Sequence, residues 1–476
     1  MALARDIIQM RVLRNAEPPN PALVDTGPRF QRAQYVWRRT RTLFEQKGAG
    51  KLRYKRVLGF GGFGMVQLWQ ILEPDGKVSR EIAVKFPLIS GQRTLSSETR
   101  VEIAWMGITF RNCEHITQLA RIGKGTEIEK GRLYNNPDAE SPIIVMEVLP
   151  KGSLRDLIGR INAAREFKFR NPTLKNQHKI GYIPNRVLWR MFLCLTRAII
   201  GLAYPPTEEA QNKPAPYREI INPRGLTPPI PSKVIHFDLD PQNILIGDID
   251  HAGRDNEHNR SPKIKIADFG CTRVWNDELD EEGKIKLIQR GKWDWSAPEQ
   301  RQPQKWIRQY IGHPINVWAI GVTMFNLLTL RHPVDGTWGP LYRQFKQDIR
   351  DPPVVPVSTW GWQLVEDDSA PLEAFIQSYD YALRQLIARC MCDDPRNRPD
   401  LEELLWRIEY GIYNSDRNFT PRRSQRADFD NYAARLGPLD AVQGIEPDST
   451  IARFYKDHLH DPPIKPDPYA SLWSGP

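Results

Sequence analysis

The pattern of apolar residues in this chain changes near residue 150, and this change constrains the fold more than any other feature of the sequence. Before it, apolar residues come in short runs bounded by turn signals such as 73–77, which predicts strands. The expected strands are 54–58, 65–69, 81–85 and 142–149. After it, the apolar stretches are long, which predicts buried helices. Including one early helix, the expected helices are 96–111, 187–204, 317–330, 381–391 and 401–408.

Strands followed by helices favour an α+β architecture, with a small β-rich lobe and a larger helical lobe. We expect the folded domain to cover residues 52–411, with the N-terminal lobe over 52–149 and the C-terminal lobe over 150–411. Polar or proline-rich insertions interrupt the second lobe, and the middle one predicts an irregular surface loop. These insertions are 161–184, 205–232 and 247–262.

The segments that flank the domain differ in charge. Residues 1–50 hold nine Lys/Arg and four Asp/Glu, which is half of the net charge of +10. We expect residues 1–51 to form a basic extension that packs partly on the domain. Nucleic-acid binding by this arm is the alternative, which the scarcity of aromatic residues disfavours. Residues 412–476 are polar, contain proline and show no strong period, so they predict a C-terminal tail.

A glycine-rich segment lies between the first two expected strands. Gly59, Gly61 and Gly64 let a hairpin backbone approach phosphate groups closely, because no Cβ stands in the way. Lys85 ends a buried-looking strand 21 residues after Gly64, so a cation directed into a cleft is expected there.

A second polar group lies in tight turns between apolar flanks. Asp238 is followed five residues later by Asn243, and Asp268-Phe269-Gly270 comes 25 residues after Asn243. Three side-chain oxygens that converge in this way suit a phosphate-bound magnesium ion and a hydroxyl group awaiting deprotonation.

Together these motifs resemble those of eukaryotic protein kinases, in the correct order over residues 52–411. The similarity extends to Met146, which stands before the expected hinge, and to Ser296-Ala297-Pro298-Glu299. Arg398 matches the buried arginine that pairs with Glu299 in that family.

The resemblance implies ATP-dependent phosphoryl transfer to a hydroxyl group of a protein substrate. In that family Asp238 would accept the hydroxyl proton, Asn243 and Asp268 would hold Mg²⁺, and Lys85 would bind the α- and β-phosphates. The residues implied to contact ATP are Gly59, Gly61, Gly64, Val66, Ala83, Lys85, Met146, Glu147, Leu149 and Leu245.

A carboxylate must position Lys85, and the helix expected at 96–111 offers two. Glu102 is preferred over Glu98, because Glu102-Ile103-Ala104-Trp105-Met106 matches the family pattern. Met106 would then pack towards Phe269. Glu98 is explained instead as an acidic residue in the first turn, where the helix dipole favours negative charge.

Phe237 departs from the family pattern, which has arginine before the catalytic aspartate. That arginine pairs with a phosphorylated activation-loop residue, and residues 271–295 contain a single hydroxyl, that of Thr272. Both features predict an enzyme that needs no activation-loop phosphorylation. A requirement for phosphate on Thr272 or Ser296 would contradict this.

A second departure is a pair of exchanged residues. Asp240 stands where Ser/Thr kinases carry lysine, and Lys292 stands where they carry threonine. In the family these positions face each other, so we hypothesise that Lys292 pairs with Asp240 and restores the lost positive charge. In the alternative, both side chains point to solvent and the site is degraded. A third departure, Asn316 for aspartate, predicts weaker tethering of the catalytic loop.

The leading interpretation is an active kinase of the Ser/Thr type, and the alternative is a nucleotide-binding pseudokinase that acts as a scaffold. The acceptor hydroxyl is the least supported part, because both Ser/Thr hallmarks are replaced. Five scattered cysteines predict reduced thiols and a cytoplasmic or nuclear location. No apolar run reaches the roughly 18 residues that a membrane span needs.

Overall fold

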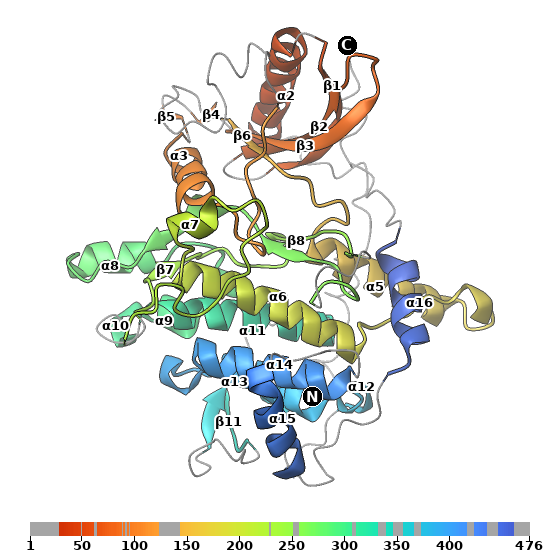
Figure 1. Cartoon of the computed structure of the whole chain (residues 1–476), viewed down its shortest axis with the longest axis vertical. Helices are drawn as coiled ribbons and strands as arrows, with labels where there is room; N and C mark the ends of the chain where they lie inside the picture. Colours follow the sequence, from red (N-terminus) through yellow and green to blue (C-terminus); the bar gives the residue numbers. More distant parts are fainter. Residues whose placement is uncertain are drawn as a thin grey trace.

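The computed structural model of this chain has two lobes, which lie one above the other in Figure 1. The smaller lobe holds an antiparallel sheet and the larger lobe is mostly helical, which confirms the α+β bilobal prediction. The structure describes residues 28–48, 50–60, 64–87, 89–90, 93–94, 96–122, 143–227, 230–250, 257–306, 311–331, 339–345, 356–365, 373–416, 423–435 and 446–460. Gly61 therefore lies outside the described residues.

The sheet of the small lobe contains four strands in the order β1-β2-β3-β6, all antiparallel. They are β1 (Leu52–Phe60), β2 (Gly64–Leu72), β3 (Val78–Pro87) and β6 (Ile144–Met146). Each overlaps one of the expected strands. Two short strands, β4 (Ile89–Ser90) and β5 (Arg93–Thr94), pair with each other.

Helix α2 (Pro28–Lys47) covers one face of this sheet. Its buried residues recur at helical spacing, and Phe44 contacts the rings of Trp69 and Phe86 at 5.2 and 5.1 Å between centroids. The part of the N-terminal extension over residues 28–47 is therefore a helix in the core of the small lobe, which is more order than the sequence predicted. The domain boundary at residue 52 remains a prediction.

The helix expected at 96–111 ends earlier and changes geometry. Helix α3 spans Ser96–Ala104, and a π-helical turn, η2, continues it over Trp105–Thr109. The wider turn is closed by the Phe110 amide, which donates to the Trp105 carbonyl at 2.8 Å. Such turns are often found at functional sites.

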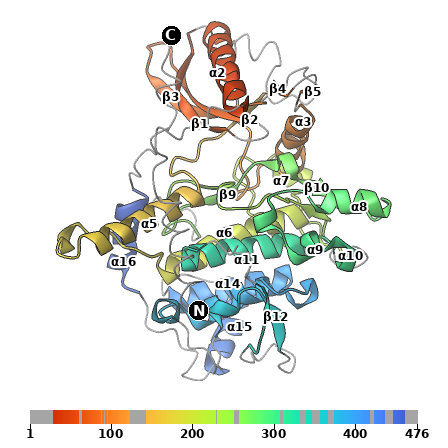
Figure 2. The same cartoon turned by 180° about the vertical axis from the view of Figure 1, so that it is seen from behind.

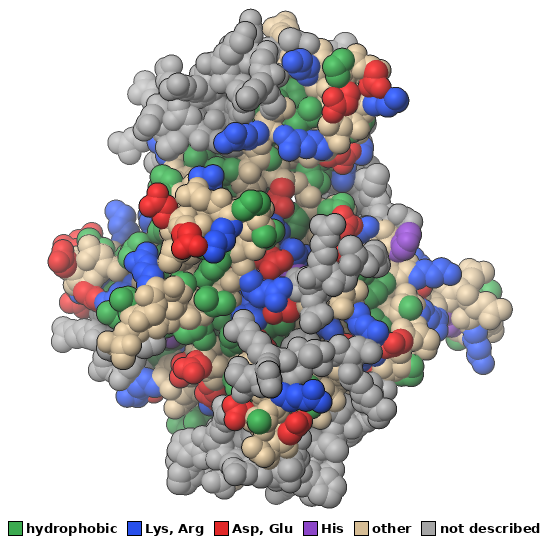
Figure 3. All heavy atoms as spheres, viewed as in Figure 1, with side chains coloured by type: hydrophobic (Ala, Val, Ile, Leu, Met, Phe, Trp, Pro, Cys, Tyr) green, Lys and Arg blue, Asp and Glu red, His purple; other side chains and the backbone are tan. Residues whose placement is uncertain are grey.

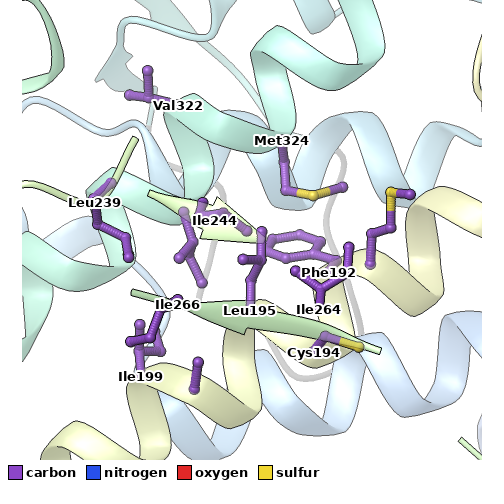
Figure 4. Packing of buried hydrophobic residues seen from close by; sticks show 14 of the residues in the cluster. Phe192, Cys194, Leu195, Ile199, Leu239, Ile244, Ile264, Ile266, Val322 and Met324 are labelled. Carbon is purple, nitrogen blue, oxygen red and sulfur yellow. The ribbon is translucent and has the colours of Figure 1, made fainter. Parts of the chain in front are cut away.

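One hydrophobic core fills the large lobe. Figure 4 shows its centre, where side chains of α6, α11 and the strands β8 and β9 meet. The main helices are α5 (Leu154–Arg170), α6 (Asn185–Ala203), α11 (His313–Thr329), α13 (Tyr381–Cys390) and α14 (Leu401–Ser415). Those expected at 187–204, 317–330, 381–391 and 401–408 are all present.

Short strands at the top of this lobe carry the polar motifs. Two antiparallel pairs, β8 with β9 and β7 with β10, hold the loop that contains Asp238 and the segment that begins at Asp268. The strands are β7 (Val234–Ile235), β8 (Ile244–Ile246), β9 (Ile264–Ile266) and β10 (Arg273–Val274). Helix α8 (Glu281–Ile288) follows and projects from the side of the molecule in Figure 2.

The expected C-terminal tail contains regular structure. Helix α15 (Arg423–Arg435) buries Phe429, and helix α16 (Asp448–His458) lies beside α5 and buries Phe454 in the core of the large lobe. The insertion at 161–184 begins as the continuation of α5. In α16 the residues that pack on the core are 451, 454, 455 and 458, which recur at helical spacing. This helical period was not predicted from the sequence.

The insertion at 205–232 is not simply a surface loop. The Tyr217 amide donates to the Asn112 carbonyl and the Glu114 amide donates to the Tyr217 carbonyl, so the insertion lies against the segment after η2. Glu219 in this insertion is fully buried. The expectation of an exposed, irregular loop was therefore wrong for this part.

Smaller elements complete the large lobe. They are α7 (Glu208–Gln211), α9 (Pro298–Arg301), α10 (Pro303–Trp306), α12 (Ala374–Gln377), β11 (Leu341–Arg343), β12 (Val357–Thr359) and the 3₁₀ turns Lys175–Gln177, Phe269–Cys271, Trp293–Trp295, Trp362–Leu364 and Pro395–Asn397. Within the described ranges, no helix is both long and apolar enough to cross a bilayer.

Candidate active site

Lys85 lies between the two lobes with a carboxylate on either side. Its Nζ is 2.7 Å from Glu102 Oε2, on α3, and 2.8 Å from Asp268 Oδ1, at the end of the β9 segment. Of the two acids considered for this helix, Glu102 therefore forms the ion pair, and Glu98 lies in the first turn of α3. The pair fixes α3 against the strand that carries Lys85.

Burial and pairing compete in setting the charges of this cluster. Burial disfavours the charged form of Lys85, but Asp268 and Glu102 outweigh it and raise its pKa, so the ammonium is retained. Burial also raises the pKa of Glu102, to about 7, although Lys85 opposes that change. For Asp268 the same lysine outweighs burial and lowers the pKa, which keeps this carboxylate ionised.

The loop after β7 holds Asp238 and Asn243 in contact. Asn243 Nδ2 donates to the backbone carbonyl and to Oδ2 of Asp238, each at 2.8 Å. Asp238 Oδ1 is buried and accepts no hydrogen bond from any residue that the structure describes. Burial raises the pKa of Asp238 to about 6, and the nearby charges of Asp240 and Asp268 act in the same direction while Lys292 opposes them. One carboxylate oxygen of Asp238 is thus available to a hydroxyl group.

Asn243 and Asp268 offer oxygen donors that fit a magnesium ion. Asp268 adopts a left-handed backbone conformation, with φ 64°, and its Oδ1 accepts from Lys85 and, at 3.4 Å, from the Gly270 amide. No described residue donates a hydrogen bond to its Oδ2 or to Asn243 Oδ1. A carboxylate and an amide oxygen are hard ligands of the kind Mg²⁺ takes.

Lys292 and Asp240, the exchanged residues, are in contact. Lys292 Nζ forms a hydrogen-bonded ion pair with Asp240 Oδ2 and lies 3.5 Å from Asp238 Oδ1. Asp240 is buried, and its other oxygen accepts the Gln242 amide at 2.7 Å. Burial opposes the charge of Lys292, but Asp240 and Asp238 outweigh it and raise its pKa. The arrangement in which both side chains point to solvent is therefore not the one observed.

Asp240 also has a backbone role that sequence reasoning did not identify. Its Oδ1 stabilises the turn that leads from Asp238 to Asn243, because an aspartate oxygen can accept the amide two residues later. A lysine at this position could not accept that hydrogen bond. The residue type thus suits both the ion pair and the turn.

Phe237 is buried and replaces the guanidinium of the family pattern with an aromatic ring. Its φ of 66° is unusual for a residue other than glycine, and its carbonyl lies against Gly291 of the activation segment, residues 268–299. A Cβ on Gly291, whose φ is 88°, would stand 1.7 Å from that oxygen, so only glycine fits there. The two segments are in close contact at this point.

The hydroxyl groups near this segment are both buried. Thr272 Oγ1 donates to the His236 carbonyl at 3.5 Å, and Ser296 Oγ donates to the Lys292 carbonyl at 3.1 Å. A kinase acting on either would have to displace the surrounding chain. Whether activity needs a phosphate on this segment stays a prediction.

Asn316 makes two hydrogen bonds to the backbone before the catalytic loop. Its Oδ1 accepts the His236 amide at 3.1 Å, and its Nδ2 donates to the Val234 carbonyl at 2.9 Å. An aspartate could make only the first of these. The weaker tethering predicted from the lost charge is thus offset by a second bond.

A cluster of aromatic rings connects the segment after η2 to the catalytic loop. The ring of Phe269 lies 5.5 Å from Phe110 and 5.1 Å from His236. Met106, the residue expected to pack towards Phe269, is buried in the same core, but the aromatic partner on this side is Phe110. Phe110 lies beyond the motif of the helix, and no pattern in the sequence indicated that it would contact Phe269.

Arg398 and Glu299 form the expected buried ion pair. Two nearly parallel contacts of 2.6 and 2.7 Å join the guanidinium to the carboxylate, and Arg398 also donates to the Pro314 and Cys392 carbonyls. Every charge in this buried pair is therefore matched, which fixes the end of the activation segment on the large lobe.

Three of the residues expected around the adenine lie on the strands β3, β6 and β8. Ala83 and Met146 are register partners in β3 and β6, and Leu245 bridges to Ser153. The Glu147 carboxylate is occupied by Lys265 Nζ at 2.6 Å and the Gln118 amide at 2.7 Å, so its side chain has a structural role. Gly59, Gly64, Val66 and Leu149 are described, but no contact tests their role.

Comparison with known proteins agrees with this geometry. Residues 231–407 match the family model described as the protein kinase domain. The chain is 24% identical over 360 residues to serine/threonine-protein kinase ssp1 of Schizosaccharomyces pombe, covering 71% of this chain and 46% of that protein. It is 24% identical over 176 residues to serine/threonine/tyrosine-protein kinase HT1 of Arabidopsis thaliana, covering 37% and 34% respectively. The matches span less than half of the length of these relatives.

Proposed function

We propose that this chain, whose residues 231–407 match the protein kinase domain, is an active enzyme of the eukaryotic-type protein kinase family. It transfers the γ-phosphate of ATP to a Ser or Thr hydroxyl of a protein, and it needs no phosphate on its own activation segment. The observation that carries the proposal is the buried Lys85 cluster, in which one ammonium joins Glu102 of α3 to Asp268.

On the nucleotide side, Lys85 and the glycine-rich turn between β1 and β2 would hold the phosphates of ATP. Asn243 and Asp268 would hold Mg²⁺, which when bound neutralises part of the phosphate charge. Glu102 keeps Lys85 in position, because its carboxylate is the partner of Lys85 on the α3 side. These residues supply positioning and charge, the two contributions on which phosphoryl transfer depends.

On the acceptor side, Asp238 orients the substrate hydroxyl and takes its proton. Its Oδ2 is held by Asn243, whereas its Oδ1 accepts no hydrogen bond from the described residues and is left for this purpose. Lys292 Nζ, 3.5 Å from that oxygen, provides positive charge beside the reacting groups, where the family has a lysine at the Asp240 position. The exchange thus keeps an ammonium group beside Asp238, now on Lys292, and adds the Asp240 carboxylate that pairs with it.

The choice of Ser or Thr over Tyr is supported by the name of one relative, a serine/threonine-protein kinase, whereas the name of the other also includes tyrosine. Phosphoamino-acid analysis of the product distinguishes these acceptors. We also propose a cytoplasmic or nuclear location, since the five cysteines are buried thiols.

A pseudokinase scaffold is the second candidate, favoured by Phe237, Asp240 and Asn316. The contacts of Asp240 and Asn316 weaken this reading, because each residue makes two specific interactions. Nucleic-acid binding is not favoured either. On the face shown in Figure 3, basic side chains are interspersed with acidic ones.

The test is γ-phosphate transfer by the purified chain to generic protein substrates, with Mg²⁺-ATP binding measured in parallel. We expect Asp238→Asn to lower transfer on the order of 10³-fold while ATP still binds. The matched control is Asp75→Asn, on the exposed turn before β3, which leaves transfer unchanged. Wild-type protein that binds Mg²⁺-ATP without any transfer would establish the scaffold instead.

A further inference from the structure

Three potential metal ligands meet in the interior, away from the site just described. They are His115, Cys194 and His258, all buried, and their ligand atoms lie within 4.8 Å of one another. The Nε2 atoms of the two histidines face each other at 3.1 Å, and Cys194 Sγ is 4.0 Å from His258 Nδ1. Two imidazoles and a thiol are thus directed into one small volume.

A carboxylate holds one of these histidines from behind. His115 Nδ1 contacts Glu219 Oε2 at 2.7 Å, and the His115 amide donates to Glu219 Oε1 at 2.8 Å. This leaves Nε2 of His115 directed towards His258 and Cys194. In histidines that bind metals, the N–H of the other ring nitrogen usually donates a hydrogen bond to a carboxylate or carbonyl, which fixes both the tautomer and the ring orientation.

Helix α6 provides room for this carboxylate. A Cβ at Gly201 would lie 2.9 Å from Glu219 Cγ, within the helix that also carries Cys194. A larger residue would push Glu219 away from His115. The helix therefore presents the thiol and accommodates the carboxylate on the same side.

The four residues come from four separate segments. His115 follows η2, Cys194 lies on α6, Glu219 belongs to the insertion 205–232 and His258 belongs to the insertion 247–262. The Ile266 amide donates to the His115 carbonyl, so β9 is attached as well. Both insertions thus contribute a buried polar residue to the same point, which gives them a shared structural purpose.

We propose that His115, Cys194 and His258 bind a Zn²⁺ ion, with Glu219 orienting His115 from outside the coordination sphere. Imidazole and thiolate are the ligands Zn²⁺ prefers, at about 2.0–2.1 Å for nitrogen and about 2.3 Å for sulfur. In a tetrahedron with those bonds the nitrogen and sulfur ligands stand about 3.3–3.6 Å apart. The Nε2 atoms of the two histidines are 3.1 Å apart, and one ligand atom from each of the three residues lies within 4.8 Å of the others. Three protein ligands leave one position for water.

The charges balance when zinc is present. The Cys194 thiolate and the Glu219 carboxylate together carry two negative charges, which match the two positive charges of Zn²⁺ beside two neutral imidazoles. A buried charge is tolerated when it is paired or coordinated, so a neutral ensemble suits this interior position.

A metal here would connect the α3 side of the molecule to the large lobe. His115 follows the segment that carries Glu102 and Phe110, whereas Cys194 and His258 belong to the large lobe. The ion would hold this junction in place without any phosphate. Zinc binding at this site is independent of phosphoryl transfer.

The metal-free alternative is a shared proton. Burial opposes charge on His115, but Glu219 and Cys194 outweigh it and raise its pKa to about 10. A proton on Nε2 could then be donated to His258, which would satisfy both rings with no metal. The two arrangements differ in composition, so they can be separated by measurement.

The experiment is metal analysis of the full chain, purified without chelators and dialysed. We expect about one zinc per chain. His258→Ala and Cys194→Ser should each lose it. The matched controls, Cys113→Ser and His178→Ala, should retain it, since Cys113 is equally buried and both residues lie outside the cluster. Zinc that persists in the cluster variants would overturn the site.

A second readout keeps the test decisive if those variants fail to fold. Chelator-treated wild-type protein should take up Co²⁺ with a near-ultraviolet thiolate-to-metal band and visible bands of tetrahedral cobalt. The melting temperature should fall by about 5 °C on chelation and recover with Zn²⁺. Wild-type protein that contains no zinc, binds neither ion and melts unchanged with chelator would establish the shared proton. Copper in place of zinc would overturn the assignment of the metal.

Discussion

Two lysines of the active site each lie between two carboxylates, yet their surroundings differ. The side chain of Lys85 is 8% exposed, between Glu102 and Asp268, whereas that of Lys292 is 43% exposed, beside Asp240 and Asp238. Interactions between charges are stronger and less screened away from water. The buried cluster is therefore fixed by the fold, whereas the exposed cluster can be rearranged by substitution.

The largest expected effect comes from the buried cation. Lys85→Met should lower kcat/KM on the order of 10³-fold, because it removes the phosphate counter-charge and leaves two carboxylates without their partner. Lys292→Met should lower kcat/KM only about tenfold, since water already screens much of the Lys292 charge. Initial rates of γ-phosphate transfer measure both. The control is Lys77→Met, an exposed lysine of the turn before β3. Equal losses at Lys85 and Lys292 would remove the distinction.

A medium effect is expected on the acid side of the pH profile. Asp238 must be ionised to accept a proton, and burial raises its pKa to about 6, so kcat/KM should fall as the pH decreases through about 6. Lys292 lowers this pKa and Asp240 raises it. Lys292→Ala should therefore move the limb to higher pH, on the order of one unit, and Asp240→Asn should move it to lower pH.

Rate measurements from pH 5 to about pH 8 test those shifts. Shifts in the same direction for both variants would mean that neither charge acts on Asp238. In that case the exposed cluster would be a surface ion pair and nothing more.

The smallest effect is expected at the two buried hydroxyl groups. Thr272→Val and Ser296→Ala should change the transfer rate by less than about threefold. Each variant removes one weak hydrogen bond, and on this account neither hydroxyl carries a phosphate that could be lost. Phosphatase treatment of the wild type should leave its rate unchanged, with intact mass confirming the absence of phosphate. A rate that collapses on dephosphorylation would show that the segment is switched after all.

The sequence predicted the members of both clusters because each belongs to a motif with fixed spacing. Glu102 was distinguished from Glu98 by the residues that follow it. Lys292 was identified as the partner of Asp240 because the two positions face each other in the family. These are local patterns, and the family fold brings them together. The choice of Glu102 and the Asp240 contact both agree with the observed ion pairs.

Features without local spacing could not be predicted in this way. His115 and His258 are 143 residues apart, and Cys194 and His258 are 64 apart, so only the folded chain brings them together. Helix α2 was not predicted from the sequence, because its few buried residues are separated by many charged ones. Phe110 is placed in the aromatic cluster around Phe269 by the π-helical turn, and no apolar period in the sequence predicts that turn.

The most direct test of the exchanged site is a double-mutant cycle in transfer rate. Asp240→Lys places two ammonium groups together and removes the acceptor of the Gln242 amide, and Lys292→Thr leaves Asp240 without its partner. Asp240→Asn serves as the control that retains the turn. We predict that each single variant is slower and that the double variant recovers, with a coupling energy on the order of 1–3 kcal/mol. Losses that simply multiply would show that Lys292 and Asp240 act independently, and would contradict the account.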